Sequence, residues 1–220
     1  MTGNNPSSPM HESEKNHPQI SPSPLQYSFN DASVANQRNR VIIRSLRNVF
    51  GNALSQFALV WENEHDWLIR NGNIIALAMR LNAQAITNFI ATFVDDTTMR
   101  PESQVNRIRE YIRNMHSYED AADLTIRRFV KLADDLVHYC MRAQPPPHTY
   151  GILEEFTRNT PILTRVWRWS LVDMRLIISS LETAIDFVDF PVHMRNMLRS
   201  TARMCTSKAA YLQAYSDAMA

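Results

Sequence analysis

Apolar residues recur every three or four positions over most of the chain, which is the repeat of helices that bury one face. In the stretch 101–115 they fall at Val105, Ile108, Tyr111, Ile112 and Met115. Glycine, which hairpin turns and phosphate-binding loops use for backbone angles that other residues avoid, occurs only four times. The sequence therefore predicts an all-α fold, a mostly antiparallel bundle of five or six helices.

Capping and turn residues divide the first half of this bundle. The pair Asn30–Asp31 is a good N-cap, so the first helix is expected from there to about Arg70, with a bend at Gly51. The turn sequence Asn71-Gly72-Asn73 is expected to separate it from a second helix over about 74–94.

Prolines and caps mark the later boundaries. They predict a third helix from Pro101 to about Met115 and a fourth from Ser117, unless the third continues, with a stop at Pro145–Pro147. A single helical turn is expected near 152–156, followed by a long helix that Thr160–Pro161 opens and that reaches about Phe187. A last helix is expected from Pro191 to about Tyr215.

The N-terminal residues 1–30 differ in composition from the rest of the chain. They are rich in Ser, Pro, Asn and His and too poor in apolar residues to offset the entropy of ordering, so we expect a disordered tail ahead of a single helical domain over 31–220. Ser8, Ser21 and Ser23 each precede a proline, which makes them candidates for phosphorylation by proline-directed kinases.

Composition excludes several classes of protein. The net charge is +1, so no overall field draws the chain to nucleic acid or membranes. The most apolar stretch, 74–94, is interrupted by polar residues such as Arg80 and Asn82, which argues against a transmembrane span, and no secretory signal opens the chain. Cys140 and Cys205 fall on apolar helix faces and are expected to be buried, reduced thiols. The sequence predicts a soluble, intracellular protein, cytoplasmic or nuclear.

Two pairs of residues have the spacing of metal ligands. Glu62 and His65, and likewise Asp135 and His138, lie three positions apart on a helix, and paired motifs of this kind hold di-iron centres in ferritin-like bundles. Such a centre needs carboxylates from two further helices, for which Asp95 or Asp96 and Asp173 are candidates. One motif has Asp in place of Glu, and surface positions explain all four residues. We therefore expect no metal and no cofactor.

The last helix is strongly asymmetric. Arg195, Arg199 and Arg203 recur every four residues on one side, and the other side carries apolar residues. No acidic residue occurs between Asp189 and Asp217. Such a helix can dock by its apolar face and present the arginines to a partner.

These patterns favour a non-enzymatic interaction module, an adaptor or regulator that binds another protein through a groove or a helical face. The candidate binding residues are Arg195, Arg199 and Arg203. No Walker A, nucleophile-elbow or dinucleotide motif indicates catalysis. A ferritin-like metal-binding or oxidoreductase bundle is the alternative. Binding of an anionic membrane or nucleic acid by the basic last helix is a third hypothesis.

Overall fold

The structure, a computed structural model, describes residues 24–94 and 99–220. In chain order its elements are α1 (Pro24–Phe50), α2 (Ala53–Phe89), the π-helical turn η1 (Ile90–Val94), α3 (Pro101–Arg142), α4 (Thr149–Asp186) and α5 (Pro191–Met219). All regular elements in these described ranges are helical, and five are α-helices. The prediction of an all-α bundle of five or six helices is confirmed.

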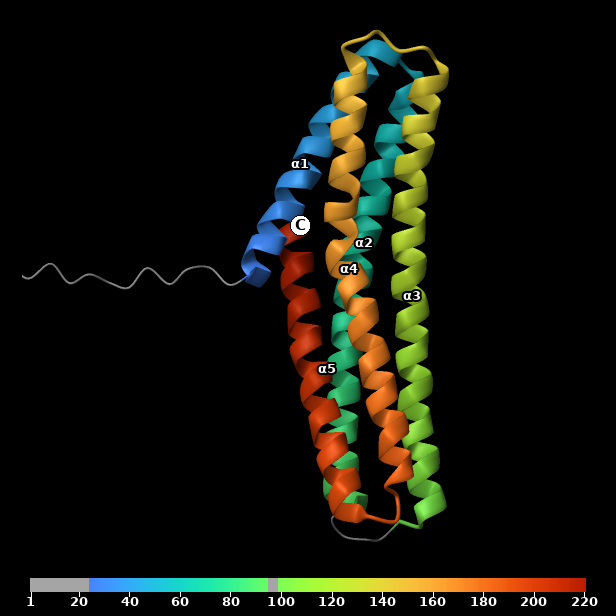
Figure 1. Cartoon of the computed structure of the whole chain (residues 1–220), viewed down its shortest axis with the longest axis vertical. Helices are drawn as coiled ribbons and strands as arrows, with labels where there is room; N and C mark the ends of the chain where they lie inside the picture. Colours follow the sequence, from blue (N-terminus) through green and yellow to red (C-terminus); the bar gives the residue numbers. More distant parts are fainter. Residues whose placement is uncertain (1–23, 95–98) are drawn as a thin grey trace, which may run out of the picture.

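The helices form a long rod in which each α-helix runs antiparallel to the one before it (Figure 1). The longest, α3, has 42 residues and therefore extends about 63 Å. Helices α2, α3 and α4 each follow most of the rod and make three of its corners. The fourth corner is shared, because α5 lies along one half of the rod and α1 along the other (Figure 1).

Contacts along α4 show where α5 replaces α1 at the shared corner. On the α1 side, Asn159 donates a hydrogen bond to Asn39 at 2.9 Å. Four residues further along α4, the carbonyl of Leu163 accepts a hydrogen bond from the Tyr215 hydroxyl of α5 at 2.8 Å. The two helices meet where the ring of Phe29 on α1 packs against Tyr211 on α5, with centroids 5.0 Å apart.

Large aromatic side chains fill the half of the rod that α1 covers. The buried indole of Trp61 lies 4.6 Å from the ring of Phe129 and 5.1 Å from that of Phe156, measured between centroids. These three residues come from α2, α3 and α4, so one cluster joins three corners. Burying side chains of this size is a main source of stability in a helical bundle.

The predicted break at Asn71-Gly72-Asn73 is wrong, since α2 continues through it. Gly72 is buried, and a side chain there would overlap the hydroxyl of Ser216 on α5 and lie 3.5 Å from Trp167 on α4. Glycine is needed here for close helix packing and not for a turn. The chain turns instead at Gly51, which has a φ of +66° and ends α1, where the sequence predicts only a bend.

The predicted helix start at Thr160–Pro161 is also wrong. Helix α4 begins at Thr149, and Pro161 lies inside it. The Thr160 hydroxyl caps nothing, because it donates back to the carbonyl of Phe156 at 3.1 Å. A proline inside a helix costs about 3 kcal/mol, and the fully buried Phe156 and Leu163 on either side hold the helix together across it.

Two boundaries come out differently from the first expectation. Residues 101–142 form one helix, so the third predicted helix continues past Ser117. Helix α1 begins at Pro24, ahead of the Asn30–Asp31 cap. The expectation of a disordered tail falls, for residues 1–23, outside the described residues, as do the phosphorylation candidates Ser8, Ser21 and Ser23. The helix stop at Pro145–Pro147 and the start at Pro191 are confirmed.

Candidate anion-binding groove between α2 and α5

A groove of about 710 Å³ runs between α2 and α5. Its lining residues are Arg80, Ala83, Gln84 and Thr87 of α2 and Arg199, Ala202, Arg203, Thr206 and Ser207 of α5. The two alanines are nearly buried, and the long polar side chains on either side are exposed. The groove therefore has a small apolar floor and walls that carry guanidinium, amide and hydroxyl groups. We call it the α2–α5 groove.

Small residues let α2 and α5 approach closely enough to form this groove. Gly72 and Ala76 of α2 and Ala209 of α5 are buried. Opposite its arginines, α5 is held by an apolar face that includes Met194, Leu198, Cys205, Leu212 and Tyr215, all fully buried. The predicted docking of the last helix by its apolar side is confirmed.

Among the residues that the structure describes, no carboxylate lines the groove. In the sequence, α2 carries no Asp or Glu after Asp66, and α5 carries none before Asp217. The Arg80 guanidinium donates to the Gln213 side chain at 3.3 Å, and a neutral amide leaves its charge in place. Positive charge therefore accumulates along this pair of helices.

Several arginines elsewhere on the bundle have carboxylate partners. Arg175 lies 2.6 Å from Glu119, and Arg127 lies 2.6 Å from Asp123. The fourth basic residue of α5, Lys208, pairs with Asp173 of α4 at 3.0 Å. The groove differs from these surfaces because, among the described residues, no acidic side chain lines it beside Arg80 and Arg203.

The arginines that the sequence singled out are partly brought together. Arg199 and Arg203 line the groove, whereas Arg195 is half-buried, lies outside the lining and interacts within the chain, as Arg199 also does. Sequence reasoning missed Arg80 on the facing helix. The spacing of Arg80, Gln84 and Thr87 places them on one face of α2, but only the fold shows that α5 packs beside that face.

The candidate metal ligands that the structure describes do not assemble, and Asp95 and Asp96 lie outside the described residues. Arg40 lies 2.7 Å from the carboxylate of Glu62, and Lys131 lies 2.8 Å from that of Asp135. His138 is exposed. Within residues 24–94 and 99–220, no group of three His, Cys, Asp or Glu side chains could hold a metal ion. A di-iron centre of the ferritin type therefore has no ligand set among the described residues.

His65 corrects the expectation that these four residues occupy the surface. It is only 1% exposed, and neither ring nitrogen has a hydrogen-bond partner among the described residues. Burial lowers the pKa of His65 below its usual 6.5, and the nearby Arg40 lowers it further. The neutral imidazole is therefore the form that the folded protein favours.

The two cysteines are buried and unpaired, as predicted. Burial raises the pKa of Cys140 to about 11 and that of Cys205 to about 12. A thiol must ionise to act as a nucleophile or to bind a metal. Neither cysteine is suited to catalysis at neutral pH.

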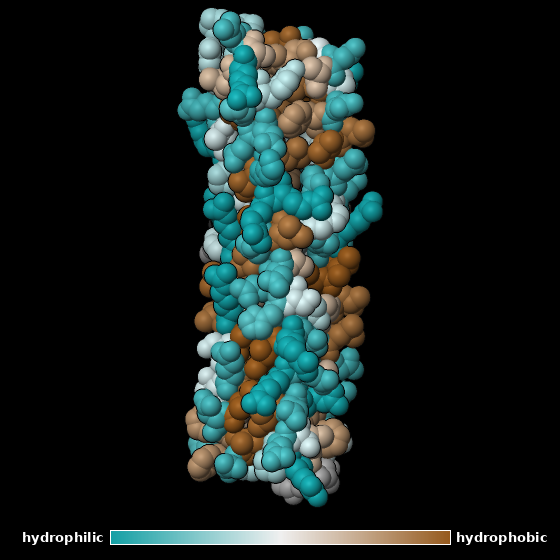
Figure 2. Space-filling view, turned by 90° about the vertical axis from the view of Figure 1, so that its right-hand side faces the viewer, coloured by the Kyte–Doolittle hydropathy of each residue, from teal (hydrophilic) through white to brown (hydrophobic). Residues whose placement is uncertain are grey.

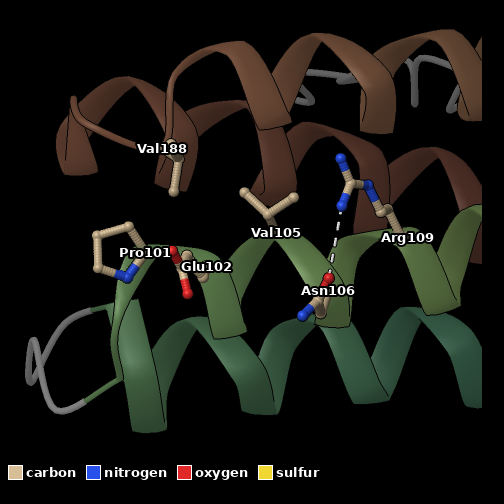
Figure 3. Close-up of a pocket in the computed structure, with 6 residues that line it drawn as sticks. All are labelled: Pro101, Glu102, Val105, Asn106, Arg109 and Val188. Carbon is tan, nitrogen blue, oxygen red and sulfur yellow. Dashed lines mark hydrogen bonds between the residues drawn. The ribbon is translucent and has the colours of Figure 1, made fainter.

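A second hollow, of about 440 Å³, lies where α3 begins, beside the connection between α4 and α5. Val188 of that connection faces Pro101 and Val105, while Arg109 donates to Asn106 at 3.5 Å (Figure 3). Glu102 also lines this hollow, so it contains both signs of charge. It does not select an anion as the α2–α5 groove does.

The rest of the described surface is mixed in character. One hollow of about 460 Å³ is lined by Arg127, Lys131 and Arg168 but also by Asp134 and Asp135, so it contains both signs of charge. On the face turned toward the viewer in Figure 2, hydrophilic side chains cover most of the rod, and hydrophobic ones gather in separate clusters. By length and composition, α2 with η1 could cross a membrane, but 44% of its apolar window is buried inside the bundle. Core helices of water-soluble proteins meet the same criteria.

No protein-family model, curated protein or solved structure matches this chain.

Proposed function

We propose that the protein is a non-enzymatic interaction module, an adaptor or regulator, that binds acidic groups of a partner protein in the α2–α5 groove. One observation carries the proposal. Arg80 and Arg203 project from facing helices into a groove that no carboxylate of residues 24–94 or 99–220 lines. An anion bound between them would meet two guanidinium groups with no competing acid in the lining.

The other lining residues suit the same ligand. Arginine presents a planar fork of N–H donors that matches a carboxylate. Gln84, Thr87, Thr206 and Ser207 supply neutral donors beside it. Because the net charge of the whole chain is only +1, the attraction is local to the groove and should weaken as salt is added.

The lining argues for binding in preference to catalysis. Its ionisable side chains are arginines, which remain protonated and cannot act as general bases. Metal analysis of the purified protein distinguishes the ferritin-like alternative from the proposed binding function. Stoichiometric iron, manganese or zinc that is lost on replacing His65 and His138 would favour that alternative over the groove.

The test is a pull-down, read by mass spectrometry, with the wild type and the double variant Arg80→Gln/Arg203→Gln. Glutamine keeps helix propensity and removes charge. The matched control is Arg109→Gln/Arg113→Gln, which removes two exposed arginines from α3. Circular dichroism checks that all three proteins keep the same helical content.

We expect a set of acidic partners that the control retains and the groove variant loses. Exposed charges contribute little to stability, so such a loss reports binding and not unfolding. If the groove variant captures the same partners as the wild type, the groove is ordinary solvated surface and the proposal is wrong.

A further inference from the structure

An exposed apolar stripe follows α2 beside the groove. Ile74, Leu77 and Leu81 are 63%, 52% and 58% exposed. Their spacing of three and then four residues is the spacing of a coiled-coil seam. We call these three residues the α2 stripe.

The α2 stripe and the groove share one face of α2. Arg80 is three residues after Leu77, and Gln84 is three residues after Leu81, so these side chains are neighbours on the helix surface. Across the groove stands Arg203 of α5. The apolar seam therefore has a basic border on the side of α5.

We propose that the α2 stripe and the α2–α5 groove together dock an acidic amphipathic helix of a partner protein. The inference rests on the function proposed above and names the class of partner. The apolar residues of the docked helix would pack on Leu77 and Leu81, and its acidic residues would lie over Arg80 and Arg203. Helices bound in this way contribute apolar residues at positions i, i+3 or i+4, and i+7.

Charge complementarity selects an acidic helix over a basic one. From Trp67 to the end of α2 the chain carries Arg70 and Arg80 and no carboxylate. A basic helix on this face would meet arginines with no acid to pair with. An acidic helix would gain bidentate contacts with them.

The exposed aliphatic side chains of the α2 stripe favour an acidic helix over nucleic acid or an anionic membrane as the ligand. Nucleic acid would use the arginines, but its phosphates and bases gain little from exposed aliphatic side chains. A bilayer would take up the aliphatic side chains, yet three of them bury little apolar area in lipid. A single seam on a single helix matches the width of one partner helix.

The length of the stripe sets the length of the partner. Ile74 and Leu81 are seven residues apart, which is about 10 Å along the helix. A partner helix of about 14 residues, four turns, covers the stripe with a turn to spare at each end.

Helix α4 provides an internal control. Val172 and Leu176 are 55% and 57% exposed, nearly the same as the α2 stripe. The carboxylates of Asp173 and Glu119 border this part of the surface, in ion pairs with Lys208 and Arg175. It therefore offers similar aliphatic area without an acid-free basic border.

The experiment measures binding of labelled synthetic peptides by fluorescence anisotropy. The probe is an amphipathic peptide of about 14 residues with leucines in a seam and glutamates beside it. One control peptide has lysine in place of every glutamate, and another has the same composition in scrambled order. Circular dichroism of the mixture shows whether the probe becomes helical when it binds.

We expect the wild type to bind the acidic probe and neither control peptide. Affinity should fall by about tenfold or more in Arg80→Gln/Arg203→Gln and in Leu77→Ser/Leu81→Ser. The controls Arg109→Gln/Arg113→Gln and Val172→Ser/Leu176→Ser should bind the probe as the wild type does. Salt should weaken the binding, because charge contributes to it.

Several results would overturn the inference. Equal binding of the scrambled peptide would mean that no helical seam is recognised. Tighter binding of phosphatidylserine vesicles or of single-stranded RNA, dependent on the arginines and not on Leu77 and Leu81, would assign the face to those ligands. If the probe fails to bind while Arg80→Gln/Arg203→Gln still loses partners in the pull-down, the helix is wrong and the groove function stands. If Arg80→Gln/Arg203→Gln keeps both the binding of the probe and the partners of the pull-down, both proposals are wrong.

Discussion

Replacing Gly72 with alanine should destabilise the protein, against the usual effect of that substitution in a helix. In a helix interior, alanine is favoured over glycine by about 1 kcal/mol. The new methyl group would overlap the hydroxyl of Ser216, which is fully buried between α2 and α4. Overpacking of a well-filled core costs about 1–3 kcal/mol. The expected net loss is about 1 kcal/mol, or about 2–4 °C in Tm for a protein of this size.

The same structure predicts that Gly72→Ala becomes stabilising when Ser216 is also replaced by alanine. The Ser216 hydroxyl has no hydrogen-bond partner among the described residues, so removing it should be nearly neutral. With the hydroxyl gone, a methyl group on Gly72 would lie 3.5 Å from the Cβ of residue 216, an ordinary van der Waals distance. The double variant should therefore be about 0.5–1 kcal/mol more stable than Ser216→Ala alone.

Urea unfolding of the wild type, the two single variants and the double variant measures this coupling directly. The reasoning requires Gly72→Ala to destabilise the wild type and to stabilise the Ser216→Ala protein. If Gly72→Ala is as stable as the wild type, the Ser216 hydroxyl rotates aside freely and the close approach of α2 and α5 does not depend on glycine.

Three further predictions concern ionisation and the N-terminal residues. The pKa of His65 is lowered in the fold, so on acidification the unfolded chain takes up a proton before the folded protein does. The free energy of unfolding should therefore be full above about pH 6.5 and should decline as the pH falls from there through the lowered pKa. In His65→Gln, urea denaturation at a series of pH values should show a smaller decline over this range. At about pH 8 the raised pKa values of Cys140 and Cys205 should keep both thiols slow toward a colorimetric thiol reagent until the protein is denatured. Removing residues 1–23, which are poor in apolar side chains, should leave Tm unchanged within about 2 °C on thermal denaturation; a larger drop would show that they pack on the bundle.

The repeat of apolar residues was enough to predict the fold class, because burial of one helix face depends on local spacing. Local spacing could not tell a turn glycine from a packing glycine. Asn71-Gly72-Asn73 has the composition of a turn, but the side chain excluded at Gly72 belongs to Ser216, which is far away in the sequence. The meaning of that glycine depends on which helix packs against it.

Pro161 shows the same limit. Proline after threonine is typical of a helix start, and the local sequence shows only a single helical turn near 152–156 ahead of it. The buried residues before and after it, including Phe156 and Leu163, belong to one continuous core that only the assembled bundle reveals. Local preference was overridden by tertiary packing.

The sequence predicted only the α5 side of the candidate site. The spacing of Arg199 and Arg203 on α5 was visible in the sequence, since one helix carries both. Arg80 contributes only because α2 and α5 lie side by side, which the sequence does not show. His65 was placed on the surface because it neighbours charged residues, but it is buried, and Arg40 of α1 lies near it in the fold.

The corner shared by α1 and α5 implies that the rod does not open as one unit. Helix α1 buries Ile42, Ile43 and Leu46 but also the amides of Asn36 and Asn39, whereas α5 buries a longer apolar face that includes Met194, Leu198, Leu212, Tyr215 and Met219. The amide side chains gain less from burial than aliphatic ones do. We therefore expect helix α1 to detach while α2 to α5 remain folded, as a separate cooperative unit. Native-state hydrogen exchange should show this as two levels of protection along one edge of the rod, with the step where Phe29 meets Tyr211.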